Sequence, residues 1–185
     1  REAIMKTIPQ MRLGELAAYV CSHLASRGIH VVLSGGGCVA IYASGPYSSM
    51  DLDFIARLHA TRRKLKGALA EIGFTEKNRY FVHPDTQFFL EFPSGPLAVG
   101  SEPVAEVEEL HLKTGTLRLL SPTDCIKDRL AAFYHWNDRQ CLQQAVWVAL
   151  EQQVDWEELE RWSRQEEEME KFEMFRGRFK ADGVR

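Results

Sequence analysis

The stretch "SGGGCVAIYASGPYSSMDLDFIA", residues 34–56, contains the two features on which the expected fold depends. The first is a run of three glycines at 35–37, which follows the apolar, β-branched segment HVVL at 30–33 after one serine, Ser34. The second is a pair of aspartates, Asp51 and Asp53, separated by one leucine inside another apolar run. Each feature has an ordinary structural interpretation and a chemical one.

The glycine run connects a segment that predicts a buried strand to a short apolar segment, CVAIYASG, that predicts a helix. Glycines allow a sharp turn there and a close approach of the backbone to a ligand, and the N–H groups at a helix start favour an anion such as phosphate. A glycine turn also serves plain strand-to-helix geometry. Neither a Gly-Lys-Ser/Thr sequence nor GxGxxG is present, so the glycines alone leave both interpretations open.

The aspartates lie in the segment MDLDFIA, whose alternation predicts a strand with Asp51 and Asp53 on one face. Two neighbouring carboxylates repel each other, and burying either one is costly unless a cation is present. Mg²⁺ resolves such a conflict, because it binds to one or two carboxylates together with substrate phosphates and water. The alternative is an Asp-x-Asp pair at the exposed end of a strand, with no metal.

The remaining patterns predict helices and strands around these two features. Apolar positions from Leu13 to Leu24 indicate a first helix, and RYFV and TQFFLEF, at 79–82 and 86–92, indicate a pair of strands. From residue 121 onward the pattern is helical, beginning at a cap formed by Ser121 or Thr123. We therefore expect an α/β (α+β) core with a mixed sheet over residues 1–120 and a helical region over residues 121–185 packed on it.

The composition excludes several classes of protein. The 185 residues are 45% hydrophobic with a net charge of -3, which describes an ordinary globular protein. The weakly acidic total argues against a surface for bulk nucleic-acid binding and leaves a local basic groove open. The four cysteines form no CxxC pair and no zinc-site spacing. No apolar run reaches the roughly 18 residues of a membrane span, and the first ten residues lack the pattern of a secretion signal. These observations favour a cytoplasmic protein without membrane association.

In combination, the glycine run, the short helix and the Asp-x-Asp strand resemble the signature of the polymerase-β-like nucleotidyltransferases. The segment is most similar to the bacterial stand-alone branch, which includes toxins of toxin–antitoxin and abortive-infection systems. In that resemblance Gly35 and Gly36 are the glycine pair, followed by Gly37, and Ser49 is the hydroxyl residue before the aspartates. The resemblance is specific over residues 31–56 and implies a mixed sheet flanked by helices.

The resemblance also implies a third carboxylate and a basic residue. Glu91, an isolated acid inside the apolar strand FFLEF, is the best candidate for the carboxylate, and Asp85 is the weaker one. A solvent-facing strand edge is the alternative interpretation of Glu91. Lys127 or Arg129, on the first helix after the sheet, would meet the triphosphate, although an exposed helix with intrahelical ion pairs explains them equally well.

Two departures from the family pattern leave an inactive member open. Many members have a serine directly after the first glycine of the pair, whereas this chain has only glycines and then Cys38. The third acid is often an aspartate, whereas Glu91 extends one methylene further.

The function implied by the resemblance is the transfer of a nucleoside monophosphate from a nucleoside triphosphate to a hydroxyl of RNA, protein or a small molecule. The implied metal ligands for Mg²⁺ (or Mn²⁺), which are also the catalytic residues, are Asp51, Asp53 and Glu91. The implied substrate-binding residues are Gly35, Gly36, Gly37, Ser49, Lys127 and Arg129. A cognate antitoxin is an implied partner. The alternative is an inactive domain of this fold that binds a nucleotide or a protein partner.

Overall fold

The fold is seen in a computed structural model that describes residues 7–44, 47–56, 61–104 and 106–184. Its strands are β1 Val31–Ser34, β2 Asp51–Ala56, β3 Thr75–Lys77, β4 Tyr80–Val82, β5 Phe89–Glu91, β6 Ala98–Val99, β7 Glu102–Pro103, β8 Val107–Leu112 and β9 Gly115–Leu120. Its helices are the 3-10 helix η1 Ile8–Gln10 and α1 Leu13–Ser26, α2 Gly35–Tyr42, α3 Arg62–Ala70, α4 Pro122–Trp136, α5 Arg139–Glu151, α6 Trp156–Gln165 and α7 Met169–Gly183.

A seven-stranded mixed sheet forms the centre, in the order β3-β4-β5-β2-β1-β9-β8, and β6 and β7 form a separate pair. Strand β1 lies between an antiparallel neighbour, β2, and a parallel one, β9. Strand β2 in turn runs parallel to β5. The sheet therefore brings together segments that are far apart in the chain, and it confirms the mixed sheet flanked by helices expected from the sequence.

The central strands β1 and β2 bury most of their apolar side chains. Val31, Val32 and Leu33 of β1 are fully inaccessible, which fits a strand with cover on both faces. In β2 the fully buried residues are Leu52 and Phe54, while the alternate positions, including both aspartates, are only partly buried. One face of β2 thus belongs to the hydrophobic core, and the other carries the carboxylates.

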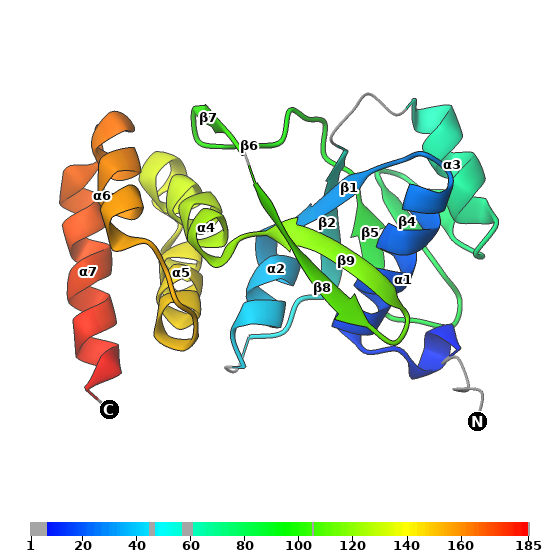
Figure 1. The fold of residues 1–185 in the computed structure, drawn as a ribbon, viewed down its shortest axis with the longest axis horizontal. Coiled ribbons are helices and arrows are strands. Elements are labelled where there is room, and N and C mark those ends of the chain that lie inside the picture. Colours follow the sequence, from blue (N-terminus) through cyan, green and yellow to red (C-terminus); the bar gives the residue numbers. More distant parts are fainter. Residues whose placement is uncertain (1–6, 45–46, 57–60, 105, 185) are drawn as a thin grey trace.

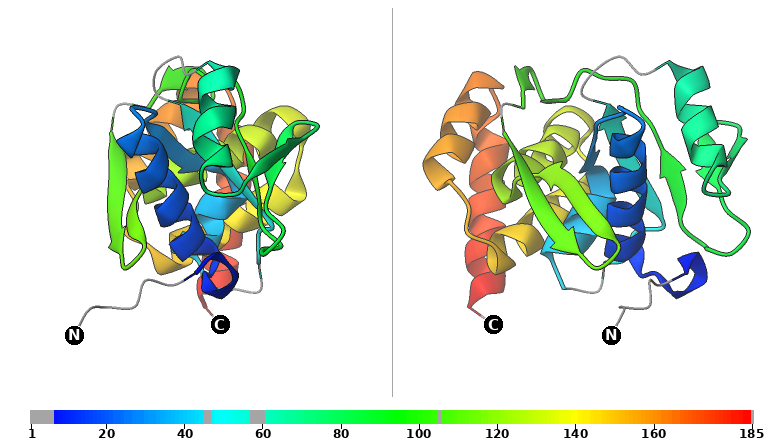
Figure 2. Two further views of the ribbon diagram at one scale, coloured as in Figure 1. Left: turned by 90° about the vertical axis from the view of Figure 1, so that its right-hand side faces the viewer. Right: turned by 45° about the vertical axis from the view of Figure 1, so that its right-hand side comes forward.

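The helices lie in two groups (Figures 1 and 2). Helix α1 packs against β9 and β1 and also contacts α3. Helices α4–α7 gather at the opposite end of the molecule, where α4 and α5 contact α2. One hydrophobic cluster includes residues from both sides of residue 120. The division into a core of residues 1–120 and a helical region of residues 121–185 therefore stays a prediction.

The helix ends follow the expected chemistry. Gly28, at the end of α1, has a φ of +72°, the left-handed conformation that glycine adopts readily at such positions. Of the two predicted caps, Ser121 is the one that caps α4, by accepting a hydrogen bond from the backbone N–H of Asp124. Asp138 caps α5 in the same manner by accepting hydrogen bonds from two backbone N–H groups.

Three expectations need correction. The glycines do not form a turn separate from the helix, because α2 begins at Gly35 and the glycines make its first turn. Strands β3 and β6–β9 were not predicted at all. The sequence places the end of α2 at Gly45 and Pro46, which lie outside the described residues, whereas the helix ends earlier, at Tyr42.

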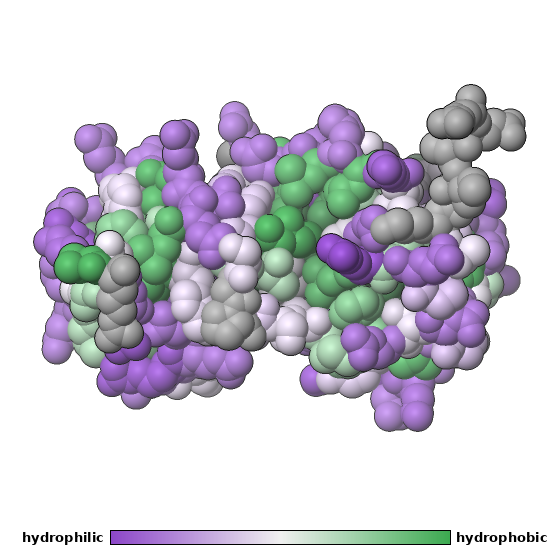
Figure 3. Space-filling model, turned by 90° about the horizontal axis from the view of Figure 1, so that it is seen from below, coloured by the Kyte–Doolittle hydropathy of each residue, from purple (hydrophilic) through white to green (hydrophobic). Residues whose placement is uncertain are grey.

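The surface shown in Figure 3 is largely hydrophilic, with hydrophobic areas interspersed between charged and polar side chains. Among the described residues, no helix combines the length and the apolar character needed to span a membrane.

Candidate functional site

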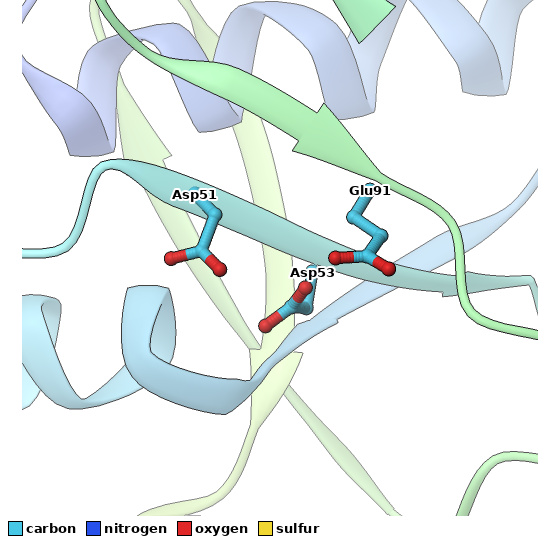
Figure 4. A group of neighbouring side chains, drawn as sticks. All are labelled: Asp51, Asp53 and Glu91. Carbon is cyan, nitrogen blue, oxygen red and sulfur yellow. The ribbon is translucent and has the colours of Figure 1, made fainter. Parts of the chain in front are cut away.

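Three carboxylates meet on the face of the sheet that is not part of the core (Figure 4). Asp51 and Asp53 extend from the same face of β2, and Glu91 lies directly opposite Asp53 in the parallel register of β2 and β5. One oxygen from each side chain lies within 4.8 Å of the others. In the part of the chain that the structure describes, this is the one group of three or more acidic, histidine or cysteine side chains with such spacing.

The Asp53 carboxyl is held in an unfavourable environment for a negative charge. Burial raises its pKa to about 7, the charges of Asp51 and Glu91 act in the same direction, and the guanidinium of Arg129 opposes them. Carboxylate oxygens are the ligands that Mg²⁺, Mn²⁺ and Ca²⁺ prefer, and a divalent cation would remove the repulsion. The residues present therefore fit a divalent metal.

Ser49 fixes the orientation of Asp51. Its hydroxyl, on a residue that is only 3% exposed, donates to Oδ1 of Asp51 at 2.7 Å and lies 3.0 Å from the backbone oxygen of the same residue. Such a bond restricts the carboxylate to one direction before any metal binds. The hydroxyl expected before the aspartates is thus placed beside the first of them.

Glu91 is an interior residue of the sheet, because β5 lies between β4 and β2. The alternative of a solvent-facing edge is therefore wrong. Its carboxylate forms an ion pair with Arg79, whose side chain is 70% exposed, with 3.3 Å between Nε and Oε1. Exposed ion pairs contribute about 0–1 kcal/mol, so Arg79 does not prevent Glu91 from turning toward a cation. Asp85, the weaker candidate, is exposed and outside the group.

The glycine run comes into direct contact with this group. Ser34 pairs with Asp53 in the register of β1 and β2, and Gly35 follows with a φ of +62°. A β-carbon on Gly35 would collide with the Asp53 carboxylate, and one on Gly36 would collide with the Tyr47 hydroxyl. A larger residue at either position would have to push a neighbouring side chain aside, and at Gly35 the positive φ favours glycine as well.

The residues after Gly36 serve the core. A β-carbon on Gly37 would lie 3.1 Å from a methyl group of Leu52, tighter than ordinary contact. Cys38, at the position after the glycines, is fully buried, with its thiol 3.8 Å from the backbone oxygen of Leu120. Any contact to an anion from this segment would therefore come from backbone N–H groups.

The two basic candidates lie on different sides of α4. The Arg129 side chain donates to Asp128 through Nε at 3.1 Å and through Nη2, and its charge reaches Asp53. The Lys127 ammonium lies 2.6 Å from Glu158 on α6 and 3.4 Å from Asp124. Of the two basic candidates, only Arg129 therefore acts electrostatically on Asp53.

Asp128 and Arg79 also border the site and were not predicted from the sequence. Asp128 Oδ2 accepts a hydrogen bond from the backbone N–H of Gly35 at 3.2 Å. The sequence shows Asp124 and Asp128 on one stripe of a helix, but it contains no signal for the segment that each of them meets. Arg79 lacks a sequence signal as well, because it lies in the turn between β3 and β4 while its partner Glu91 is on β5.

Comparison with known proteins adds one informative similarity. No family model and no curated protein matches the sequence. The structure of an antigenic nucleotidyltransferase-like protein from Paracoccidioides brasiliensis is similar, with a TM-score of 0.53 and 16% identity over 72% of this chain and 75% of that one.

Two structures of ANT(2'')-Ia are also similar at 14% identity: a solution structure of this antibiotic-resistance factor and a crystal structure in complex with adenylyl-2''-tobramycin. Their TM-scores are 0.46 and 0.45, over 93% and 92% of this chain and 92% and 97% of theirs. The similarity to the Paracoccidioides protein shows that this chain has the mixed α/β fold of nucleotidyltransferase-like proteins.

Proposed function

We propose that the protein is a magnesium-dependent nucleotidyltransferase that moves a nucleoside monophosphate from a nucleoside triphosphate to an acceptor hydroxyl. The observation that carries the proposal is the convergence of Asp51, Asp53 and Glu91 beside the glycine turn, within a fold shared with a nucleotidyltransferase-like protein. Each feature alone has an ordinary explanation. Together they provide carboxylates for a cation and backbone N–H groups for phosphate in one place.

The roles of the residues follow from their positions. Asp51, Asp53 and Glu91 would hold one or two Mg²⁺ or Mn²⁺ ions, which would supply positive charge to the phosphates of the nucleotide. Backbone N–H groups at the start of α2 and the guanidinium of Arg129 would bind the same phosphates. Glu91, or Asp53 opposite it, would accept the proton of the acceptor hydroxyl.

The acceptor is proposed to be a hydroxyl of RNA, protein or a small molecule. The resemblance of residues 31–56 to the bacterial stand-alone enzymes supports the more specific proposal of a toxin that acts in the cytoplasm and is neutralised by a cognate antitoxin. The proposed reaction needs no covalent nucleophile from the protein, because positioning and charge stabilisation suffice for phosphoryl chemistry.

The proposal is tested by incubating the purified protein with Mg²⁺, each α-labelled nucleoside triphosphate in turn, and total RNA or protein. Wild type is expected to transfer label, and Asp53→Asn is expected to abolish the transfer. Asp85→Asn is the matched control, since Asp85 is an exposed acid outside the group and its replacement should leave the rate unchanged. Nucleotide binding without transfer would favour the inactive alternative, and absence of both would contradict the proposal.

A further inference from the structure

The first N–H group of α2 is already occupied in the free protein. The backbone N–H of Gly35 donates to Oδ2 of Asp128, a residue in the middle of α4, at 3.2 Å. A helix N-terminus attracts anions, because its first N–H groups have no partner within the helix. A carboxylate of the chain itself therefore lies where the proposed function requires a phosphate.

The same carboxylate oxygen also holds the nearest guanidinium. Arg129 donates to Oδ2 of Asp128 through Nε at 3.1 Å and through Nη2. The side chains of Asp128 and Arg129 are 24% and 17% exposed, so this ion pair is partly withdrawn from water. One oxygen atom thus engages both groups that would bind the triphosphate.

We propose that Asp128 is a positioning residue that occupies the phosphate site of the free protein, and that the nucleotide binds by displacing it. The inference rests on the proposed function, because it concerns the same site. The Asp128 carboxylate and a phosphate compete for the single Gly35 N–H. Their negative charges would also repel each other strongly if both occupied this partly buried site. Displacement of Asp128 therefore frees the Gly35 N–H and the guanidinium of Arg129 together.

The bonds made by Asp128 stabilise the free protein and oppose the binding of a triphosphate. In the free protein Asp128 keeps the glycine turn ordered and offsets the charge of Arg129. When a triphosphate enters, the bonds made by Asp128 must break, so its negative charge weakens the binding of any anion at this place. A side chain that merely supported the site would have the reverse effect, since its loss would weaken binding.

Asp128→Asn separates these possibilities, because it removes the charge while leaving an amide oxygen that can accept from Gly35. The probe is inorganic tripolyphosphate, titrated calorimetrically in the absence of divalent metal. The Asn variant is expected to bind about tenfold more tightly than wild type, equivalent to about 1.4 kcal/mol. Asp124→Asn is the matched control, because Asp124 lies one turn earlier on α4 and pairs with Lys127 instead. Its affinity should equal that of wild type.

A double variant tests whether the gain depends on the released guanidinium. In the background of Arg129→Gln, the change Asp128→Asn is expected to give a smaller gain than it gives alone. Equal or weaker binding by the single Asn variant, or no binding by either that variant or wild type, would overturn the inference. Because no metal, nucleotide or turnover is involved, this result is separate from failure of the transferase proposal, which the labelling experiment detects.

A measurement on the wild-type protein covers the case in which Asp128→Asn fails to fold. Saturation with tripolyphosphate should shift the NMR signals of the Gly35 amide and the Arg129 Nε–H group, because both lose their bond to Asp128. If both signals stay unchanged at the highest concentration of the probe, the inference is wrong.

Discussion

Gly35 lies so close to Asp53 that one added methyl group would collide with the carboxylate. The contact follows from the register of β1 and β2, which places Ser34 opposite Asp53 and leads the chain directly into the glycines. The glycines that begin α2 and the acidic strand therefore form one structural unit.

Replacement of Gly35 should damage this unit. Gly35→Ala places a side chain at a φ of +62° and against Asp53, and an L-residue held in that conformation costs about 1–3 kcal/mol. Gly67→Ala is the matched control, since Gly67 lies within α3 with open space around it, and alanine there should stabilise the protein by about 0.5–1 kcal/mol. Urea unfolding measures both. Equal stability of the Gly35 variant and wild type would contradict the described geometry.

Removal of the Ser49 hydroxyl should weaken metal binding without removing a ligand. Ser49→Ala frees the Asp51 carboxylate to rotate, and the loss of such an orienting bond typically lowers metal affinity about 10–100-fold. Calorimetric titration with Mn²⁺ provides the measurement. Ser48→Ala, a change at the exposed neighbouring residue, should leave the affinity unaltered, and a similar loss in both variants would rule out this role for Ser49.

The metal-free protein should lose stability as the pH rises toward neutrality. The pKa of Asp53 is about 7 in the folded protein against an ordinary value of 3.8, so the folded state holds this proton more tightly than the unfolded chain does. Its contribution to stability is fully present below about pH 4 and is lost as the pH rises through about 7.

Urea midpoints measured in the presence of a chelator from about pH 5 to about pH 8 test this dependence. Asp53→Asn should show a smaller decline than wild type over the same range, and added Mg²⁺ should stabilise wild type most at the upper end. Parallel curves for the two proteins would mean that Asp53 does not retain its proton.

The buried ammonium of Lys127 should matter for stability and not for chemistry. Lys127 is 4% exposed, and Glu158→Gln removes its closer charged partner, so we expect a loss of about 1–3 kcal/mol in the free energy of unfolding. The rate of label transfer should stay at the wild-type value. Glu160→Gln, which alters the exposed pair with Arg164, should change stability by less than about 0.5 kcal/mol. A large loss of activity with Glu158→Gln would place Lys127 in the site after all.

The sequence predicted the parts of the site that depend on local pattern. Asp51 and Asp53 could be assigned to one face of a strand because alternation fixes the direction of side chains. Glu91 could be selected because it is an acid within an apolar strand. Its position opposite Asp53 could not be predicted, because it depends on the parallel pairing of β2 and β5, which are distant in the chain.

The choice between Lys127 and Arg129 shows where local pattern stops. Residues two positions apart on a helix point in nearly opposite directions, so at most one of them can face the site. The helical period does not tell which, because that depends on how α4 packs against α2 and α6. The structure places Arg129 on the side of the glycines and Lys127 on the side of α6.

Strands β8 and β9 were not predicted, because their place in the sheet also depends on contacts between distant segments. Strand β8 lies at the edge of the sheet and carries exposed acids at Glu108 and Glu109, so it lacks an apolar run. Strand β9 is buried through its pairing with β1, where Leu33 lies opposite Leu119. The alternation of buried Leu117 and Leu119 is a local signal for β9, but its pairing with the distant β1 leaves no mark in the local pattern.

The central position of β1 also has a consequence for the protein as it leaves the ribosome. A nascent chain that ends before β9 has every carboxylate of the acidic group, yet β1 then lacks its neighbour on one side and Gly35 lacks Asp128. The completed arrangement can arise only after α4 has been synthesised. A fragment that ends before β9 would therefore retain the acidic residues without the sheet and helix contacts that surround them in the complete fold.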